Sequence, residues 1–350
     1  MTDWGQLRIC VEQTLPHQQA EIDKLCDKSN SQQHAQILRA AYLKRNIWPL
    51  KRDDGSPTVI TIQFLEDGNS VDWTPLSSLE GRDQNGNPIQ PDPLNNELFR
   101  KVSPREMVET VVRKRIMPII GLKLKFVDQE GMIRISFDPQ QGAYSQLGTA
   151  CLGVQAGKPT MNLGWLDVGT VTHEFLHAIG AVHEHQNPRG RDIEWNEQRL
   201  FEWSKNTQGW NKKTTTTNII NTYELDQING STYDPHSVML YFYPGYLTSD
   251  NKGTSQNVRL SPMDVVWMQK IYPGGKLSPQ DFYHNAYKVV FHQKSGTEDN
   301  PIYVPDDVSR GDTGNGIGKL IGIIIGSIVG AVLLGVILWL FITKVNWRRY

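Results

Sequence analysis

The sequence is poor in cysteine and has no excess of charge of either sign. Three cysteines, Cys10, Cys26 and Cys151, allow at most one disulfide, which excludes a disulfide-stapled framework. Such poverty in cysteine favours a reducing compartment for the folded part of the chain. The 36 basic and 37 acidic residues give a formal net charge of −1. The sequence therefore predicts no nucleic-acid partner and no acidic tail.

The N-terminus lacks a basic start and an apolar run. It reads MTDWGQLRICVEQTLPH, which gives no sign of a secretory signal peptide. Apolar residues then recur at helical spacing, and we expect residues 1–46 to form an N-terminal helical segment. Three roles fit such a segment: a pro-segment, an arm that binds a partner, or a helical cover for the following domain.

Long apolar runs are absent except near the C-terminus. Leu320 to Thr343 contains no charged residue, and about 36 Å of helix would cross a hydrocarbon core of about 30 Å. We expect a transmembrane helix at 319–344, a short basic tail at 345–350 and a stalk at 276–318. This makes the chain a single-pass membrane protein with a C-terminal anchor. The basic tail favours a topology with residues 345–350 in the cytoplasm and the protease domain outside the cell or in a lumen. The lack of a visible signal peptide favours a protease domain in the cytosol instead. The sequence does not decide on which side of the membrane this domain lies.

Small residues recur within the predicted membrane helix. Gly322, Gly326 and Gly330 lie four residues apart, a spacing that lets two helices approach closely and form a homodimer. Glycine is also common in membrane helices without any such role. The sequence does not decide between these two interpretations.

From Ile47 the pattern is typical of an α+β domain, which we place at residues 47–275. Alternating apolar residues predict strands, at 59–65, 122–126, 133–137 and 159–165. Cap signals and periodicity predict helices, at 103–117, 168–179, 195–204 and 261–272. Turn-forming residues predict a long surface loop at 66–98 and a polar turn at 212–217.

The run HEFLHAIGAVHEH carries most of the chemical information. His173 and His177 are four residues apart, so they lie on one face of a helix, and His183 follows after Gly180, which can end that helix. The full pattern H-E-x-x-H-x-x-G-x-x-H is the metzincin signature. Three imidazole ligands with one open position are typical of a catalytic Zn²⁺ site with one ion per chain. Glu174 would then act as the general base.

A second element is Ser237-Val238-Met239-Leu240-Tyr241, whose Met239 lies 56 positions after His183. A methionine beside a tyrosine is usually core packing. Because it follows the long histidine motif, we interpret Met239 as the structural methionine turn beneath the metal.

These motifs resemble the astacin-like branch of the metzincin zinc endopeptidases over roughly residues 47–273. Glu184 resembles that branch's marker after the third histidine, and SVMLY is similar to its S-x-M-H-Y turn, with Leu240 in place of histidine. PTMNLGWL and HEHQNP are closer to a microbial and fungal subgroup, and LSPMDVVWMQKIYP is similar to the closing helix. The chain departs from secreted astacins because it cannot form their two disulfides. It also shows no processing site for the new N-terminus that Glu184's counterpart binds.

The resemblance implies a zincin fold: a twisted mixed sheet, an active-site helix and an irregular C-terminal subdomain. It implies that Tyr241 is a displaceable zinc ligand that then stabilises the reaction intermediate. By the same analogy, a peptide or protein substrate would pair with a sheet edge. We expect that edge directly before the histidine helix, at Thr160, Met161, Asn162 and Leu163.

The sequence thus predicts a membrane-anchored zinc endopeptidase, with a bilayer contact through 320–343. One alternative is a non-catalytic zinc-binding adhesion or interaction module on the same scaffold, which would have no need of Glu174. Another is a purely structural zinc site, which would need a fourth protein ligand that is not evident.

Overall fold

The structure of the chain is a computed structural model, and it describes residues 42–69, 71–74, 81–83, 85–96, 101–188, 193–224, 226–229, 233–287, 291–294 and 302–305. The predicted membrane span, Gly322, Gly326 and Gly330 lie outside these described residues, as does most of the predicted N-terminal helical segment. Within the described residues, no helix has the length and apolar character needed to cross a membrane.

A five-stranded mixed sheet forms the first part of the domain, in the order β6-β2-β7-β9-β8. Four strands run parallel, namely β2 (Val59–Phe64), β6 (Lys123–Val127), β7 (Ile133–Ser136) and β9 (Met161–Leu163). The fifth, β8 (Ala143–Ser145), is antiparallel to β9. Along β2, Ile60 and Ile62 are fully buried while Thr61 and Gln63 are only partly so, as the alternating pattern predicts.

The predicted edge strand is not at an edge. β9 pairs with β7 on one side and β8 on the other, and Thr160, Met161, Asn162 and Leu163 are all buried. The prediction was wrong because β8 pairs with β9 and forms the edge of the sheet in its place. The three residues of β8 show no clear alternation of apolar and polar side chains, so the sequence did not indicate this strand. Asn162 instead binds the loop before β8: its Nδ2 donates to Asp138 O and Gly142 O, and its Oδ1 accepts from Ser136 Oγ.

Two helices cover the core beside this sheet. α2 (Pro104–Val111) continues as a π-helical turn, Val112–Ile116, and α3 (Val168–Ala178) is the histidine helix. Ser103 Oγ accepts from Glu106 N, which is one half of the predicted capping box. A complete capping box forms instead between Ser261 and Asp264 at the start of α6 (Pro262–Ile271).

The predicted loop 66–98 contains short strands in its described part. β3 (Asp72–Trp73) pairs in parallel with β10 (Trp165–Leu166), and β4 (Gly81–Arg82) pairs with β5 (Pro88–Ile89). Short 3-10 turns complete the connections, at Lys44–Asn46, Pro139–Gln141, Gly148–Gly153, Glu184–Gln186 and Gly245–Leu247.

A second, smaller core lies in the part after His185. α4 (Glu197–Gln208) and α5 (Lys212–Thr215), which continues as a π-helical turn at Thr216–Ile220, surround Leu200, Trp203 and Tyr243. Residues 212–217 were predicted as a turn, but Asn211 caps a helix there by accepting from Thr214 N.

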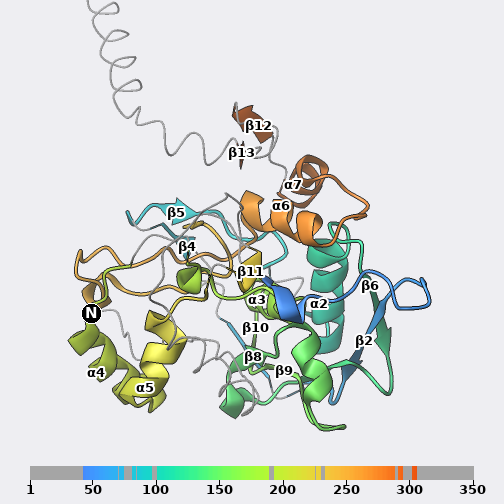
Figure 1. The fold of residues 1–350 in the computed structure, drawn as a ribbon, viewed down its shortest axis with the longest axis horizontal. Helices are drawn as coiled ribbons and strands as arrows, with labels where there is room; N and C mark the ends of the chain where they lie inside the picture. Colours follow the sequence, from blue (N-terminus) through green and yellow to red (C-terminus); the bar gives the residue numbers. More distant parts are fainter. Residues whose placement is uncertain are drawn as a thin grey trace, which may run out of the picture.

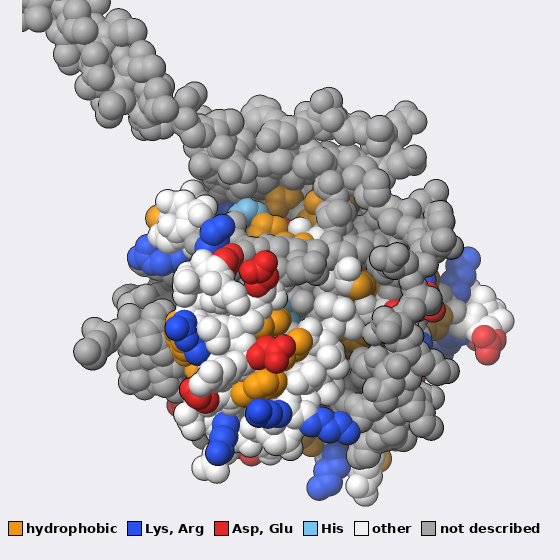
Figure 2. All heavy atoms as spheres, turned by 60° about the vertical axis from the view of Figure 1, so that its left-hand side comes forward, with side chains coloured by type: hydrophobic (Ala, Val, Ile, Leu, Met, Phe, Trp, Pro, Cys, Tyr) orange, Lys and Arg blue, Asp and Glu red, His pale blue; other side chains and the backbone are white. Residues whose placement is uncertain are grey.

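Figure 1 places α4 and α5 at the lower left and β2 and β6 at the right, with α3 between them. Figure 2 shows Lys, Arg, Asp and Glu side chains interspersed on the side that it brings forward.

The domain begins before residue 47, earlier than predicted. β1 (Tyr42–Leu43) pairs with β11 (Ile228–Asn229), and Tyr42, Leu43 and Asn46 are buried. The predicted boundary was too late because the polar residues at 44–46 separate the buried Tyr42 and Leu43 from the rest of the apolar pattern.

The predicted stalk begins too early. α7 (Pro279–Tyr287) packs on α6, and Phe282, Tyr283 and Tyr287 belong to the main core. The structure also has a hairpin of β12 (Phe291–Lys294) and β13 (Ile302–Pro305). The helix escaped prediction because Pro, Gly, Asp and Ser around it suggested a linker without periodicity.

Shortening the chain tests this new boundary. A chain ending at Lys276 loses Phe282, Tyr283 and Tyr287, and removing one buried aromatic side chain costs about 3–5 kcal/mol. Since a whole domain is stable by only about 5–15 kcal/mol, we expect this chain to be unfolded or to melt far below the full chain. A chain ending at Tyr287 should melt at the full-chain temperature by circular dichroism. Equal melting of the two shortened chains would contradict the assignment of α7 to the core.

Candidate metal centre

α3 positions the first two histidines. Its N-terminus is capped by Asp167, whose side chain accepts from Thr170 N at 2.8 Å. His173 and His177 then lie one turn apart, with ring centroids 4.7 Å apart. Nearly every residue of α3 is buried, so the helix holds both imidazoles inside the domain.

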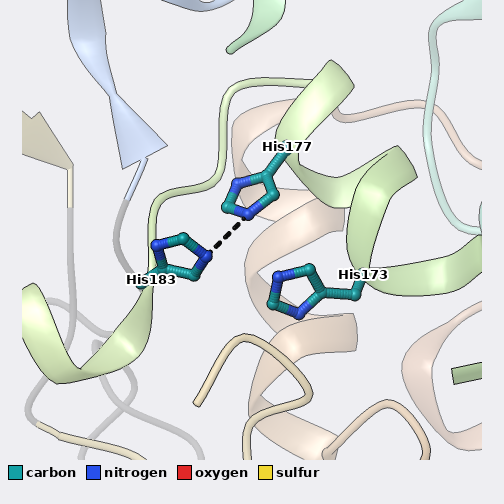
Figure 3. Close-up of side chains that lie close together, drawn as sticks. All are labelled: His173, His177 and His183. Atoms are coloured by element: carbon teal, nitrogen blue, oxygen red, sulfur yellow. Dashed lines mark hydrogen bonds between the residues drawn. The ribbon is translucent and has the colours of Figure 1, made fainter. Parts of the chain in front are cut away.

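A reversal at Gly180 brings the third histidine back to the helix. Gly180 has φ +97°, its N–H donates to His177 O at 2.8 Å, and a Cβ there would lie 3.3 Å from Asn46 O. After this turn, His183 Nε2 lies 2.9 Å from His177 Nε2. Figure 3 shows the three rings converging from the helix and the following loop.

Backbone carbonyls fix which ring nitrogens face the centre. His173 Nδ1 lies 2.8 Å from Val238 O, and His177 Nδ1 lies 2.8 Å from Ala181 O. A carbonyl oxygen can only accept, so each Nδ1 carries the proton and each Nε2 keeps a lone pair for a metal ion. One candidate ligand atom from each of the three histidines lies within 4.8 Å of the others.

Burial also keeps two of the imidazoles neutral. It lowers the pKa of His173 to about 4 and that of His183 well below its usual value. Metal ligation requires this neutral form. His173 Nε2 is buried without a hydrogen-bond partner among the described residues, so the donor set fits zinc.

Tyr241 packs against the histidines, and Glu174 is their neighbour on α3. The Tyr241 ring centroid lies 4.1 Å from that of His183 and 5.7 Å from that of His173. Glu174 follows His173 on α3 and is fully buried. His185 also packs against Tyr241, with ring centroids 5.3 Å apart, and its Nε2 lies 3.1 Å from Asn218 O.

Residues 237–240 form a turn against the metal centre. Leu240 N donates to Ser237 O, and Met239 is buried in the main core. The turn contacts two parts of the histidine motif, since His173 Nδ1 donates to Val238 O and Glu184 N donates to Met239 O at 3.0 Å. The role of Met239 as the methionine turn beneath the metal stays a prediction.

Buried carboxyl groups lie behind this turn. Glu184 Oε1 accepts from Asp234 N and from Asn187 Nδ2, while Asp264 accepts from Ser237 Oγ and Val238 N. Burial raises the pKa of Glu184 well above its usual value, and burial with the nearby Asp234 carboxylate raises the pKa of Asp264 to about 7. The sequence signal for Asp264 was present as a helix cap, but its contact with Ser237 was not predicted.

Comparison with known proteins agrees with this geometry. Residues 122–273 match the family model of the Astacin peptidases. A search among curated proteins gave no match.

Among solved structures, the chain is similar to two of myroilysin. One is 26% identical, with a TM-score of 0.49, and the similarity covers 67% of this chain and 98% of that chain. The other is 24% identical, with a TM-score of 0.41 and coverage of 76% and 100%. It is also similar to high choriolytic enzyme 1, a hatching enzyme zinc-protease from the medaka fish Oryzias latipes. That structure is 16% identical, with a TM-score of 0.37 and coverage of 67% and 98%.

The matched segment contains α3, the three histidines and the turn at Met239, and it has the mixed α+β architecture of an astacin-like metzincin. The chain is therefore a zinc metalloendopeptidase, a hydrolase whose cofactor is zinc held by His173, His177 and His183.

Proposed function

We propose that the chain cleaves protein substrates with Glu174 as general base, as a membrane-anchored enzyme. The observation that carries the catalytic part is the convergence of three buried imidazoles, with the buried Glu174 next to His173 on the same helix. Zinc, when bound, supplies a Lewis acid that polarises the scissile carbonyl and lowers the pKa of water at its open position.

The side chains of the protein move the proton and bind the developing charge. Glu174 takes a proton from the attacking water and delivers it to the departing amine. Tyr241, whose ring packs on His183, donates its phenol hydrogen to the developing oxyanion. A non-catalytic binding module on the same scaffold would have no use for a buried carboxyl group at position 174.

Isosteric variants test these two roles. Glu174→Gln removes the base and should lower the rate of peptide cleavage by about 10²–10⁴-fold at unchanged zinc content. Tyr241→Phe keeps the ring packing and should lower kcat by about 10²–10³-fold. Cleavage of a peptide library is followed by mass spectrometry, with zinc content measured on the same samples. Full activity of Glu174→Gln would exclude the base and favour the binding module.

We propose β8 as the strand on which the substrate pairs. The two edges of the sheet differ in chemistry: β6 exposes Lys123 and Lys125, which oppose strand addition, whereas β8 is uncharged and packs against α3. Gly142 and Gln146 are hydrogen-bonded toward the β9 side, because Gly164 N donates to Gly142 O and Gln146 N donates to Thr160 O. In an antiparallel pair, every second residue bonds the partner strand, and the residues between them direct their N–H and C=O groups to the opposite side. Ala143 and Ser145 therefore direct these groups away from β9, where a substrate strand could bind them.

Peptides methylated at single backbone nitrogens test this pairing. Methylation at positions that bond Ala143 or Ser145 should raise KM, because each removes one hydrogen bond, while methylation at the intervening positions should not. A scan along one cleaved peptide therefore gives an alternating KM profile. A profile without alternation would contradict strand addition at β8.

The membrane anchor is proposed from the sequence alone. The 24 charge-free residues from Leu320 to Thr343 support it by their length and apolar character. We expect the full chain to float with phosphatidylcholine vesicles and to resist extraction by alkaline carbonate. The chain ending at Tyr287 should stay in the soluble fraction. Equal behaviour of both chains would rule the anchor out.

A further inference from the structure

A continuous set of hydrogen bonds joins the metal centre to a buried carboxyl group in α6. His173 Nδ1 donates to Val238 O at 2.8 Å, Met239 N donates to Ser237 Oγ at 3.0 Å, and Ser237 Oγ donates to Asp264 Oδ1 at 2.7 Å. Val238 O and Met239 N are the two ends of one peptide group. The three bonds therefore form one path through a peptide and a hydroxyl.

All donors on this path point toward Asp264. A hydrogen bond accepted at a peptide oxygen strengthens the donor at the same peptide's nitrogen, so bonds aligned in one direction polarise one another. Ser237 Oγ accepts from Met239 N, and its own hydrogen is directed to the carboxylate. Electron density is thereby displaced toward His173, as in the carboxylate–histidine pairs that support many zinc ligands.

The surroundings keep this path rigid and dry. Asp264, Ser237 and His173 are all buried, and a low local dielectric strengthens each bond. Asp264 Oδ2 also accepts from Val238 N and Ser261 N, both at 2.9 Å, so the carboxyl group is held at both oxygens. Burial raises the pKa of Asp264 to about 7, while its hydrogen bonds and its place in the first turn of α6 favour the charged form, so the group is mostly charged at slightly alkaline pH.

We propose that Ser237 and Asp264 are positioning residues for zinc, which act through the Val238–Met239 peptide to orient His173 and strengthen its Nε2 as a ligand. The inference rests on the proposed function only because it takes the zinc site to be the catalytic site. His177 differs, because its Nδ1 bonds Ala181 O within its own turn. Zinc affinity thus depends on a helix far away in the sequence.

A matched control contacts the same segment. Asn257 Nδ2 donates to Pro235 O at 2.9 Å and to Ser237 O at 2.8 Å, so it makes two hydrogen bonds to residues 235–240, which include the turn. Neither bond lies on the path to His173. Asn257→Ala and Ser237→Ala therefore each remove two hydrogen bonds made by this segment, but only Ser237→Ala interrupts the path.

The experiment measures zinc affinity by chelator competition, and the His173 Nδ1–H proton resonance by NMR, on the full zinc-loaded chain at slightly alkaline pH. We expect Ser237→Ala to weaken zinc binding by about 10–100-fold and to shift the resonance upfield. Asp264→Asn should also weaken zinc binding and shift the resonance upfield. If Asp264→Asn does not fold because the α6 cap is lost, the result for Ser237→Ala decides the question. Asn257→Ala should leave both values as in the unaltered chain.

Two results would overturn the proposal. Unchanged affinity and resonance in Ser237→Ala would show that the path has no influence on His173. An equal loss in Asn257→Ala would show that only the position of the turn matters. Neither readout uses cleavage, so a chain that binds zinc through this path but cuts no peptide would refute the role of Glu174 and leave the path standing.

Discussion

Two of the metal-binding histidines are held by a helix, but the third reaches them only because the chain reverses at Gly180. The reversal needs a positive φ and close approach to Asn46, and both conditions suit glycine. Around it, Trp48 Nε1 donates to Ala178 O at 2.8 Å and Tyr272 Oη donates to Ile179 O. Segments from both ends of the domain thus support the same turn, and the metal centre depends on the whole domain being folded.

The donor set then fixes the chemistry that is possible. Nδ1–H bonds to Val238 O and Ala181 O leave Nε2 of His173 and His177 facing inward, and burial keeps His173 and His183 neutral by lowering their pKa values. Three such nitrogens provide a metal with three ligands and leave one position for solvent or substrate. Glu174, the proposed general base, needs no separate element to position it, because it directly follows His173 on the same helix.

Local signals in the sequence predicted the metal centre well. The spacing of His173, His177 and His183 is set within one helix and one turn, so it could be derived without knowing the rest of the fold. The order of strands could not, because the place of β9 inside the sheet depends on β8 pairing beside it. α7 was missed for a related reason: Phe282 and Tyr283 become core residues only against α6 and the sheet. The contact of Ser237 with Asp264 likewise joins two motifs that each had a local explanation.

X-ray absorption at the zinc edge tests the central claim most directly. The full chain, loaded with one equivalent of zinc, should show three imidazole nitrogens at about 2.0–2.1 Å, with oxygen from solvent or Tyr241 as the only other kind of ligand atom. A sulfur ligand at about 2.3 Å, or a fourth imidazole closing the coordination shell, would contradict an open three-histidine centre.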